Sequence, residues 1–247
     1  MIMLLGAFVF TVTFIVNAPA SFLRLGLDRV GNDFAYQSIE GSLWKGTIKN
    51  VRIGAVTLGN VDFEWSPLSV ITGTVSAKVK AFDGDGEGYG IVGIGLFSKQ
   101  ISISDASVAF DLNSIKRYTL YGLPYQGAIR AKIRHLRLSK ERCHEADLDL
   151  WTDAMSASAV KLSGEPLNLV GGAQCKDKSL QVILNGESSS GRIAIDAVVN
   201  SDFSYNMAAS VMPERTDLQQ ALTLLGFQRE GSSYVYDTIG QLKGVGS

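Results

Sequence analysis

The sequence predicts a mainly β protein: a curved, largely antiparallel sheet with one N-terminal transmembrane helix and one short C-terminal helix. Three observations support this fold class. The 247 residues include 26 glycines but only 5 prolines, as expected for many strands joined by tight turns. Hydrophobic residues make up 46% of the chain, which is enough for a sizeable core. Apolar and polar residues alternate over long stretches, which is the pattern of strands with one wet face.

The charge balance excludes one class of partner. The chain has 23 basic and 24 acidic residues, so its net charge is −1. Proteins that bind nucleic acid usually carry a clustered basic excess. We therefore expect no nucleic-acid partner.

The N-terminal residues 1–23 contain no charged side chain, since the first charge is Arg24. Their apolar length suits a membrane span. A cleaved signal peptide is the alternative, because residues 18–20 end in a small-x-small pattern, but the usual basic n-region is missing. We expect an uncleaved single-pass anchor over residues 1–23, followed by a connector over residues 24–38.

The orientation of this anchor is open to two arguments. Arg24 and Arg29 follow the apolar run and no basic residue precedes it, so the positive-inside rule would place the bulk of the chain in the cytoplasm. Long domains, however, translocate largely regardless of such charges. We expect the bulk on the exported side.

Residues 39–247 are expected to form the β domain. The clearest strand places Val61, Phe63 and Trp65 on one face and Asp62 and Glu64 on the other. Proline ends this strand at position 67, since it cannot donate to a ladder. Strands are expected in order at residues 47–53, 56–65, 74–81, 101–103, 108–112, 133–138, 147–151, 179–184, 191–199, 204–212 and 234–239. Between them, the alternating glycines of residues 84–90 favour a bend or close backbone approach.

One short helix is expected late in the chain. Pro213 and the polar residues after it mark its start, and Gly226 marks its end. Between them, apolar residues recur at helical spacing at Leu218, Ala221, Leu222 and Leu225.

The β domain shows a weak internal duplication with a period of about 85 residues. Residues 133–138 resemble residues 48–53, and residues 147–151 resemble residues 61–65. Two related units, residues 39–115 and 125–247, would then stack edge to edge. Coincidence among amphipathic strands explains the same similarity.

Cys143 and Cys175 are the only cysteines. In an exported β domain they are most simply a disulfide, which would stabilise the fold by roughly 3–4 kcal/mol in the loop-entropy model. Two buried free thiols are the alternative.

No group of residues points to catalysis or to a cofactor. His135 and His144 lack the spacing to complete a zinc site with the cysteines, because Cys143 and His144 are neighbours on a strand. The acidic run from Asp83 lacks the glutamate that a calcium loop needs at position 12, and Gly46 is not followed by the lysine and helix of a phosphate loop. We expect no enzymatic activity, no metal and no cofactor.

The three tryptophans, Trp44, Trp65 and Trp151, are expected on the apolar faces of strands. Large rings there usually pack a core or cover a sheet. Lining a hydrophobic groove is the alternative role.

Several motifs together resemble one known family. They are the apolar N-terminal run ending at Pro19-Ala20, the Gly41-x-Leu43-Trp44-x-Gly46 motif, the Phe63-x-Trp65-x-Pro67 motif followed by Gly73, the Cys143 and Cys175 pair, and the leucine-rich helix ending at Gly226. In this order they resemble the type II secretion system protein N family, also called general secretion pathway protein N, which is distantly similar to AsmA-like proteins. The resemblance covers nearly the whole chain, and the two tryptophan motifs are its specific part.

The resemblance implies a bacterial inner-membrane protein with a single span and its bulk in the periplasm. It implies an accessory structural or assembly component of type II secretion, whose partners are the inner-membrane platform or the secretin. The AsmA-like similarity implies an alternative, a periplasmic module that binds or transfers lipid in a hydrophobic β groove.

Overall fold

The computed structural model describes residues 18–24, 34–54, 56–65, 69, 73–114, 119–120, 123–124, 126–202 and 204–241. Residues 1–17 of the predicted anchor, most of the predicted connector, and Pro67 lie outside these ranges. In the described part of the chain, no helix is long and apolar enough to span a membrane.

The mainly β part of the predicted fold class is confirmed, because one large antiparallel sheet dominates the described residues. It holds 15 strands: β1 (Phe34–Ala35), β2 (Ser38–Gly41), β3 (Lys45–Ile53), β4 (Val56–Trp65), β5 (Thr74–Phe82), β6 (Gly86–Gly95), β7 (Ile101–Asp111), β10 (Ala128–Leu138), β11 (Cys143–Thr152), β12 (Leu169–Lys176), β13 (Ser179–Ser188), β14 (Gly191–Val199), β15 (Ser204–Pro213), β16 (Gln228–Glu230) and β17 (Ser233–Gln241).

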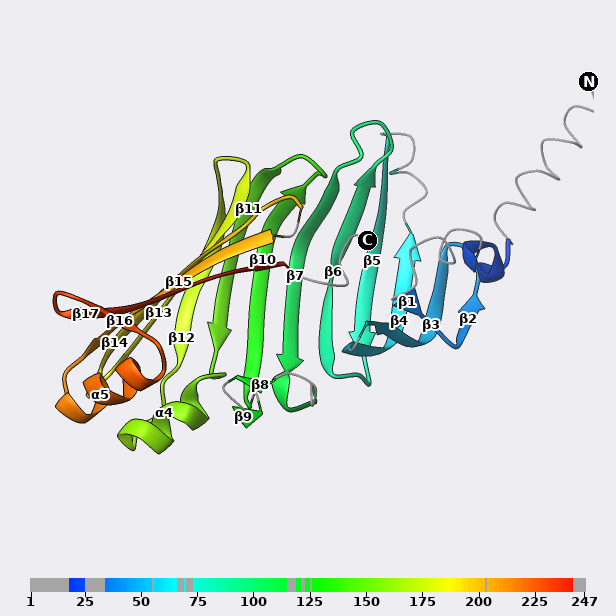
Figure 1. Cartoon of the computed structure of the whole chain (residues 1–247). Helices are drawn as coiled ribbons and strands as arrows, with labels where there is room; N and C mark the ends of the chain where they lie inside the picture. The colour runs from blue at the N-terminus through cyan, green and yellow to red at the C-terminus, as the bar shows by residue number, and fades with distance from the viewer. Residues whose placement is uncertain are drawn as a thin grey trace, which may run out of the picture.

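The strand order follows the chain almost throughout (Figure 1). It is β1-β3-β4-β5-β6-β7-β10-β11-β12-β13-β14-β15-β17-β16, with β2 also paired to β3. β1 and β2 together therefore form one broken edge strand beside β3. β8 (Thr119–Leu120) and β9 (Leu123–Pro124) make a separate small hairpin. The sheet begins at Phe34, before the predicted boundary at residue 39.

Four short helical segments accompany the sheet in the part of the chain that the structure describes. The predicted C-terminal helix is α5 (Thr216–Leu224). A second helix, α4 (Ser156–Ser163), was not predicted, because its alternating Ser and Ala residues give only a weak apolar stripe. The turns η1 (Ala20–Leu23) and η2 (Leu112–Ser114) are 3₁₀ segments.

The two predicted units are joined edge to edge in one continuous sheet. β7 pairs with β10 along its whole length, from Asp111 beside Ala128 to Ile101 beside Leu138. β3 and β10 both carry a bulge 85 residues apart, just after Ile48 and just after Ile133. A shared bulge at the same spacing supports the duplication for this strand, since bulges are positional features of a fold.

The predicted match between residues 147–151 and residues 61–65 was wrong by one residue. A constant spacing of 85 places Phe63 with Leu148, and both side chains are buried on the same face of the sheet. The predicted alignment instead placed Trp65 with Trp151, which lie on opposite faces. A shift of one residue reverses the face of every strand side chain, so the matched tryptophans were misleading.

One face of the sheet is apolar from β3 to β15, and we call it the apolar face. The pairing register aligns its residues across the strands, since partners in an antiparallel ladder share a face. Representative members are Val61, Phe63, Val79, Val92, Ile103, Val108, Ile133, Leu148, Ala173, Val182, Ile195 and Ala209. The opposite, polar face carries residues such as Lys78, Lys80 and Asp149.

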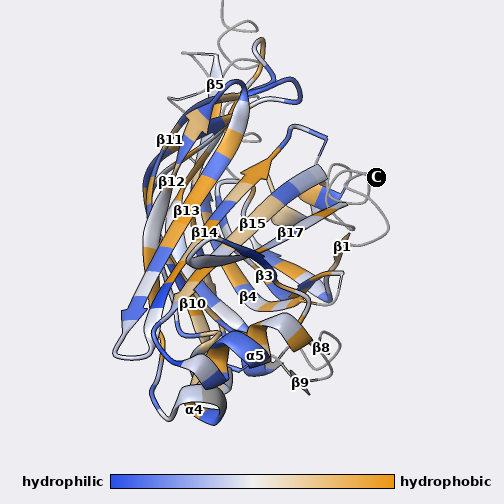
Figure 2. Cartoon of the chain, turned by 60° about the vertical axis from the view of Figure 1, so that its left-hand side comes forward, coloured by the Kyte–Doolittle hydropathy of each residue, from blue (hydrophilic) through white to orange (hydrophobic). Residues whose placement is uncertain are grey.

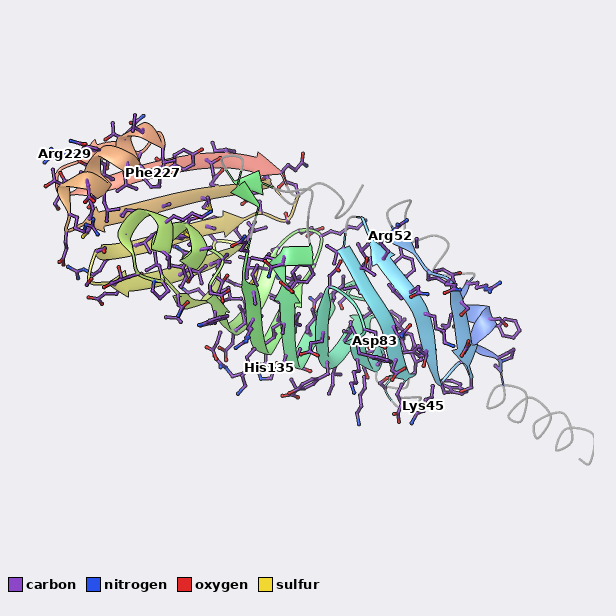
Figure 3. The ribbon with its side chains drawn as sticks, turned by 90° about the horizontal axis from the view of Figure 1, so that it is seen from below. Lys45, Arg52, Asp83, His135, Phe227 and Arg229 are labelled. Carbon is purple, nitrogen blue, oxygen red and sulfur yellow. A yellow bond between two sulfur atoms is a disulfide. The ribbon has the colours of Figure 1, made fainter. Side chains whose placement is uncertain are left out.

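The C-terminal half of the sheet curls into a trough with the apolar face inside. β15 and β17 lie across from β10 to β12, and the helices α4 and α5 sit at one end (Figures 1 and 2). Bulges bend a strand and increase its twist, and the adjacent central strands β7 and β10 both carry one where they meet β6 and β11. Seen from the helical end, His135 lies on the outside of the wall that contains β10 (Figure 3).

Candidate functional site

The inside of the trough, with the apolar face that continues from it to β3, is the main candidate site. Among the described residues of this face from β3 to β15, no side chain is charged. The backbone amides and carbonyls of the strands are used in the ladders between them. The face therefore offers almost no hydrogen-bonding group to a ligand.

Among the described residues, the helices that pack on this apolar face, α4 and α5, lie at one end of it. Ile94 and Ile101, beside the turn between β6 and β7, and Val108 and Ile129, nearer the other end of these strands, are 39–49% exposed although they lie on the apolar side. These partly exposed side chains, on a face whose described residues carry no charge, make this apolar surface a candidate interaction site. Only hydrocarbon, or the apolar face of another protein element, could cover it without leaving polar groups unpaired.

The two ends of the sheet differ. At one end, which we call the capped end, α4 and α5 close a small apolar cavity of about 130 Å³ against β13 to β15. Leu167, Ile193, Val211, Leu218 and Leu222 are among its lining residues. At the other end, which we call the open rim, strands are joined by the short turns at residues 96–100, 139–142, 177–178 and 200–203. Neither α4 nor α5 lies at this rim, where the described helical segment is the short 3₁₀ turn η1.

The Gly41 to Gly46 motif forms the tight turn that starts β3. Gly41 has a φ of +104°, and a Cβ there would lie 2.6 Å from the carbonyl oxygen of Lys45. A Cβ on Gly46 would lie 2.2 Å from the carbonyl oxygen of Glu40 and 3.0 Å from the ring of Phe63. Glycine is therefore required at both positions, because β2 and the buried Phe63 ring occupy the space of a side chain.

The same turn attaches the N-terminal segment to the sheet. The Leu43 amide donates to the carbonyl oxygen of Ala18 at 2.7 Å, and Pro19 bridges to Ser42. The Trp65 amide donates to the carbonyl oxygen of Trp44 at 2.7 Å, which joins the two tryptophan motifs. Ala18 and Ala20 are buried, so the end of the predicted anchor packs on the β domain.

The three predicted tryptophan sites have different surroundings. Trp65 is half-buried on the apolar face, and its Nε1 is enclosed without an acceptor among the described residues. The prediction for Trp151 was wrong. It lies on the polar face, where its ring stacks under the Arg130 guanidinium at 4.8 Å. Alternation with Asp147 and Asp149 places it there, and the cation–π contact makes that half-buried position on the polar face favourable.

The remaining motif residues are structural. Gly73 has a φ of +76° and lies beside the ring of Phe97 in the turn after β6. Leu96 donates its amide to the carbonyl oxygen of Gly73 at 3.0 Å. Pro67 lies outside the described residues.

The predicted disulfide is confirmed. Cys143 and Cys175 are bonded, with their Cα atoms 5.5 Å apart. The β11–β12 ladder runs only from Leu148 to Thr152, so the cysteines join the two strands beyond its last pair. The Cys143 amide also donates to the carbonyl oxygen of Lys178 at 2.6 Å. The bond therefore fastens this wall of the trough at the open rim.

Several charged groups of the polar face form cross-strand ion pairs. Arg134 donates to both Asp147 and Asp149, with an Nη1–Oδ2 distance of 2.6 Å to Asp149. These hydrogen bonds lower the pKa of both carboxyl groups and raise the pKa of the guanidinium. In the described part of the chain, no three His, Cys, Asp or Glu side chains gather as metal ligands would. Asp85, from the acidic run that begins at Asp83, accepts a hydrogen bond from the Thr57 amide at 2.8 Å and so stabilises the β5–β6 turn.

The two edges of the sheet are unequal. The N-terminal edge is interrupted between β1 and β2, and Pro19 forms a β-bridge with Ser42 just after β2. At the second, β16 pairs with only the first three residues of β17. Among the described residues, no strand covers the outer side of β17 from Tyr236 to Gln241. Sequence alternation could not identify this edge, because it depends on which strands meet.

The comparisons with known proteins gave one match. A family model described as Type II secretion system (T2SS), protein N, matches residues 32–236. The matched region extends from just before β1 to within β17. Searches of curated proteins and of solved structures found no match.

Proposed function

The chain belongs to the type II secretion system protein N family, and from this membership we propose that it is an accessory structural component of type II secretion, held at the bacterial inner membrane with its sheet in the periplasm. The observation that carries the proposal is the family match over residues 32–236, which includes nearly the whole sheet.

Two features of the chain support the location. The Cys143–Cys175 disulfide suits an oxidising compartment such as the periplasm. The uncharged residues 1–23 suit an anchor, and the hydrogen bond between Leu43 and Ala18 would couple that anchor directly to the sheet. A rigid coupling of this kind would fix the position of the sheet near the membrane.

The outer edge of β17 supports a way of binding partners. Exposed edges accept an extended strand, with affinity from backbone hydrogen bonds. Glu230 and Ser233 flank the two-residue turn between β16 and β17, and we take them as a hydrogen-bonded pair. Backbone amides alternate in direction along a strand, so the amide of Ile239 then points away from β15, toward the uncovered side of β17. The adjacent Ile239 side chain is 80% exposed.

The experiment compares Ile239→Pro with Ile239→Ala in a strain that lacks the wild-type gene. Proline removes the outward amide, whereas alanine keeps it and removes only the side chain. We expect Ile239→Pro to lower secretion of type II substrates and crosslinking to the platform or secretin, and Ile239→Ala to retain both. Normal secretion in the deletion strain itself would contradict the proposed function. A defect equal in both variants would contradict strand addition alone.

A second candidate function, lipid binding, is favoured by one specific observation. The apolar face is uncharged over its described residues and remains 39–49% exposed at Ile94, Ile101, Val108 and Ile129. An acyl chain has no polar groups to satisfy, and each CH₂ that it buries contributes about 0.8 kcal/mol. Native mass spectrometry of the detergent-extracted protein would detect retained lipid. Absence of any lipid adduct would count against this candidate.

A further inference from the structure

The turn between β6 and β7 presents the most exposed large hydrophobic side chain in the described structure. Phe97 is 90% exposed and the adjacent Leu96 is 50% exposed, and both lie on the open rim. Lys99 follows in the same turn and is also exposed. A single exposed hydrophobic residue is ordinary, so its significance depends on what else lies at the same end of the sheet.

The N-terminal segment attaches at this same end. Ala18 and Pro19 bind the turn between β2 and β3. In an antiparallel sheet, that turn lies at the same end as the turn between β6 and β7. Four strand spacings separate β2 from β6, which is about 19 Å. An anchor that ends at Ala18 would therefore hold Phe97 close to the membrane surface.

The charge of the turns also distinguishes the two ends. The described turns of the open rim, including the segment at residues 18–24, carry five basic and three acidic residues: Arg24, Lys99, Lys140, Arg142 and Lys178 against Glu141, Asp177 and Asp202. The described turns of the capped end carry two basic and six acidic residues: Lys161 and Arg215 against Asp83, Asp85, Asp153, Glu165, Glu214 and Asp217. Lys116 and Arg117 lie outside the described residues and are not counted. A basic rim is attracted to anionic lipid headgroups.

We propose that the open rim rests on the surface of the membrane that anchors the chain, with Phe97 and Leu96 in the interface and Lys99 at the level of the phosphates. This inference rests on the proposed anchor. Aromatic and aliphatic side chains gain free energy by leaving water for the interface, and adjacent basic residues add attraction to anionic lipid. The mouth of the trough would then face the bilayer, so that an acyl chain could enter it without crossing water.

The test places an environment-sensitive NBD fluorophore at Phe97→Cys in the full-length chain. Liposomes of phosphatidylethanolamine and phosphatidylglycerol carry doxyl-labelled lipids as quenchers. Leu224→Cys is the matched control, because Leu224 is 89% exposed but lies in α5 at the capped end. The native cysteines are bonded to each other and do not react with the label. Flotation first establishes that each labelled chain is bound to the liposomes.

We expect a blue-shifted emission at position 97 and quenching there severalfold stronger than at position 224. A floating chain with position 97 unquenched overturns the rim contact but leaves the anchor and the secretion role in place. Blue-shifted emission without quenching by lipid would identify a protein contact and also overturns the proposal. Stronger quenching at position 224 would show that the capped end faces the membrane. A chain that does not float overturns both the anchor and the rim contact.

Discussion

A carboxylate on the apolar face should abolish lipid retention without unfolding the protein. Val108 lies on the apolar face of β7, where it pairs with Gly88 and Ala131 and is 41% exposed. In Val108→Asp, water can still solvate the carboxylate, because this position of the apolar face is partly exposed. An acyl chain over the same position would bury it, and no basic side chain lies on this face among the described residues. Burying an unpaired polar group costs about 3 kcal/mol or more, which corresponds to at least about 100-fold weaker lipid binding.

The matched control is Ser107→Asp, one residue earlier on the same strand. Ser107 faces the polar side and pairs with Tyr89 and Lys132, so the new carboxylate would lie beside an ammonium group. Native mass spectrometry and titration with a fluorescent fatty acid measure the retained lipid in both variants. We expect normal retention in Ser107→Asp and loss in Val108→Asp. Equal retention in the two variants would refute the assignment of the apolar face as the lipid site.

Three further predictions concern stability. Replacing Cys143 and Cys175 together by serine should lower the free energy of unfolding by about 3–4 kcal/mol in urea, because the bond closes a loop with a sequence separation of 32. Gly46→Ala should cost about 2 kcal/mol in the same assay, since its Cβ would lie 2.2 Å from a backbone oxygen. The lowered pKa of Asp147 gives stability that is present above its unfolded value near pH 4 and is lost as the pH falls through the lower folded value. Arg134→Gln should therefore flatten the acid limb of a plot of melting temperature against pH.

The strands could be predicted from the sequence because alternation is a local property. Val61, Phe63 and Trp65 alternate with Asp62 and Glu64, and the structure places the two sets on opposite faces of β4. The disulfide was predictable because only two cysteines are present. Helix α5 was predictable from its leucine spacing and from Gly226, which has a φ of +89° at its end.

The features that were missed depend on contacts between distant residues. Trp151 was assigned to an apolar face from its residue type, although alternation with Asp149 and pairing with Arg130 place it on the polar face. The trough results from the combined curvature of many strands. The bulges that bend these strands also interrupt the alternation of apolar and polar residues along them. The open edge of β17 exists because β16 is only three residues long. Strand length and pairing at an edge follow from the whole topology and cannot be determined from one segment.

The position of the disulfide connects the proposed compartment with the proposed site. β11 extends from Leu148 back to Cys143 without a partner in β12, so the ladder alone would leave this wall free to separate at the open rim. The bond from Cys143 to Cys175 closes that separation at the mouth of the trough. The capped end is held together without a disulfide, because α4 and α5 pack against the strands there. Reduction should therefore loosen the mouth before the capped end, so hydrogen exchange on reduction should increase first in residues 143–147 and 175–178. A mouth that is rigid only when oxidised fits a protein that works in the periplasm.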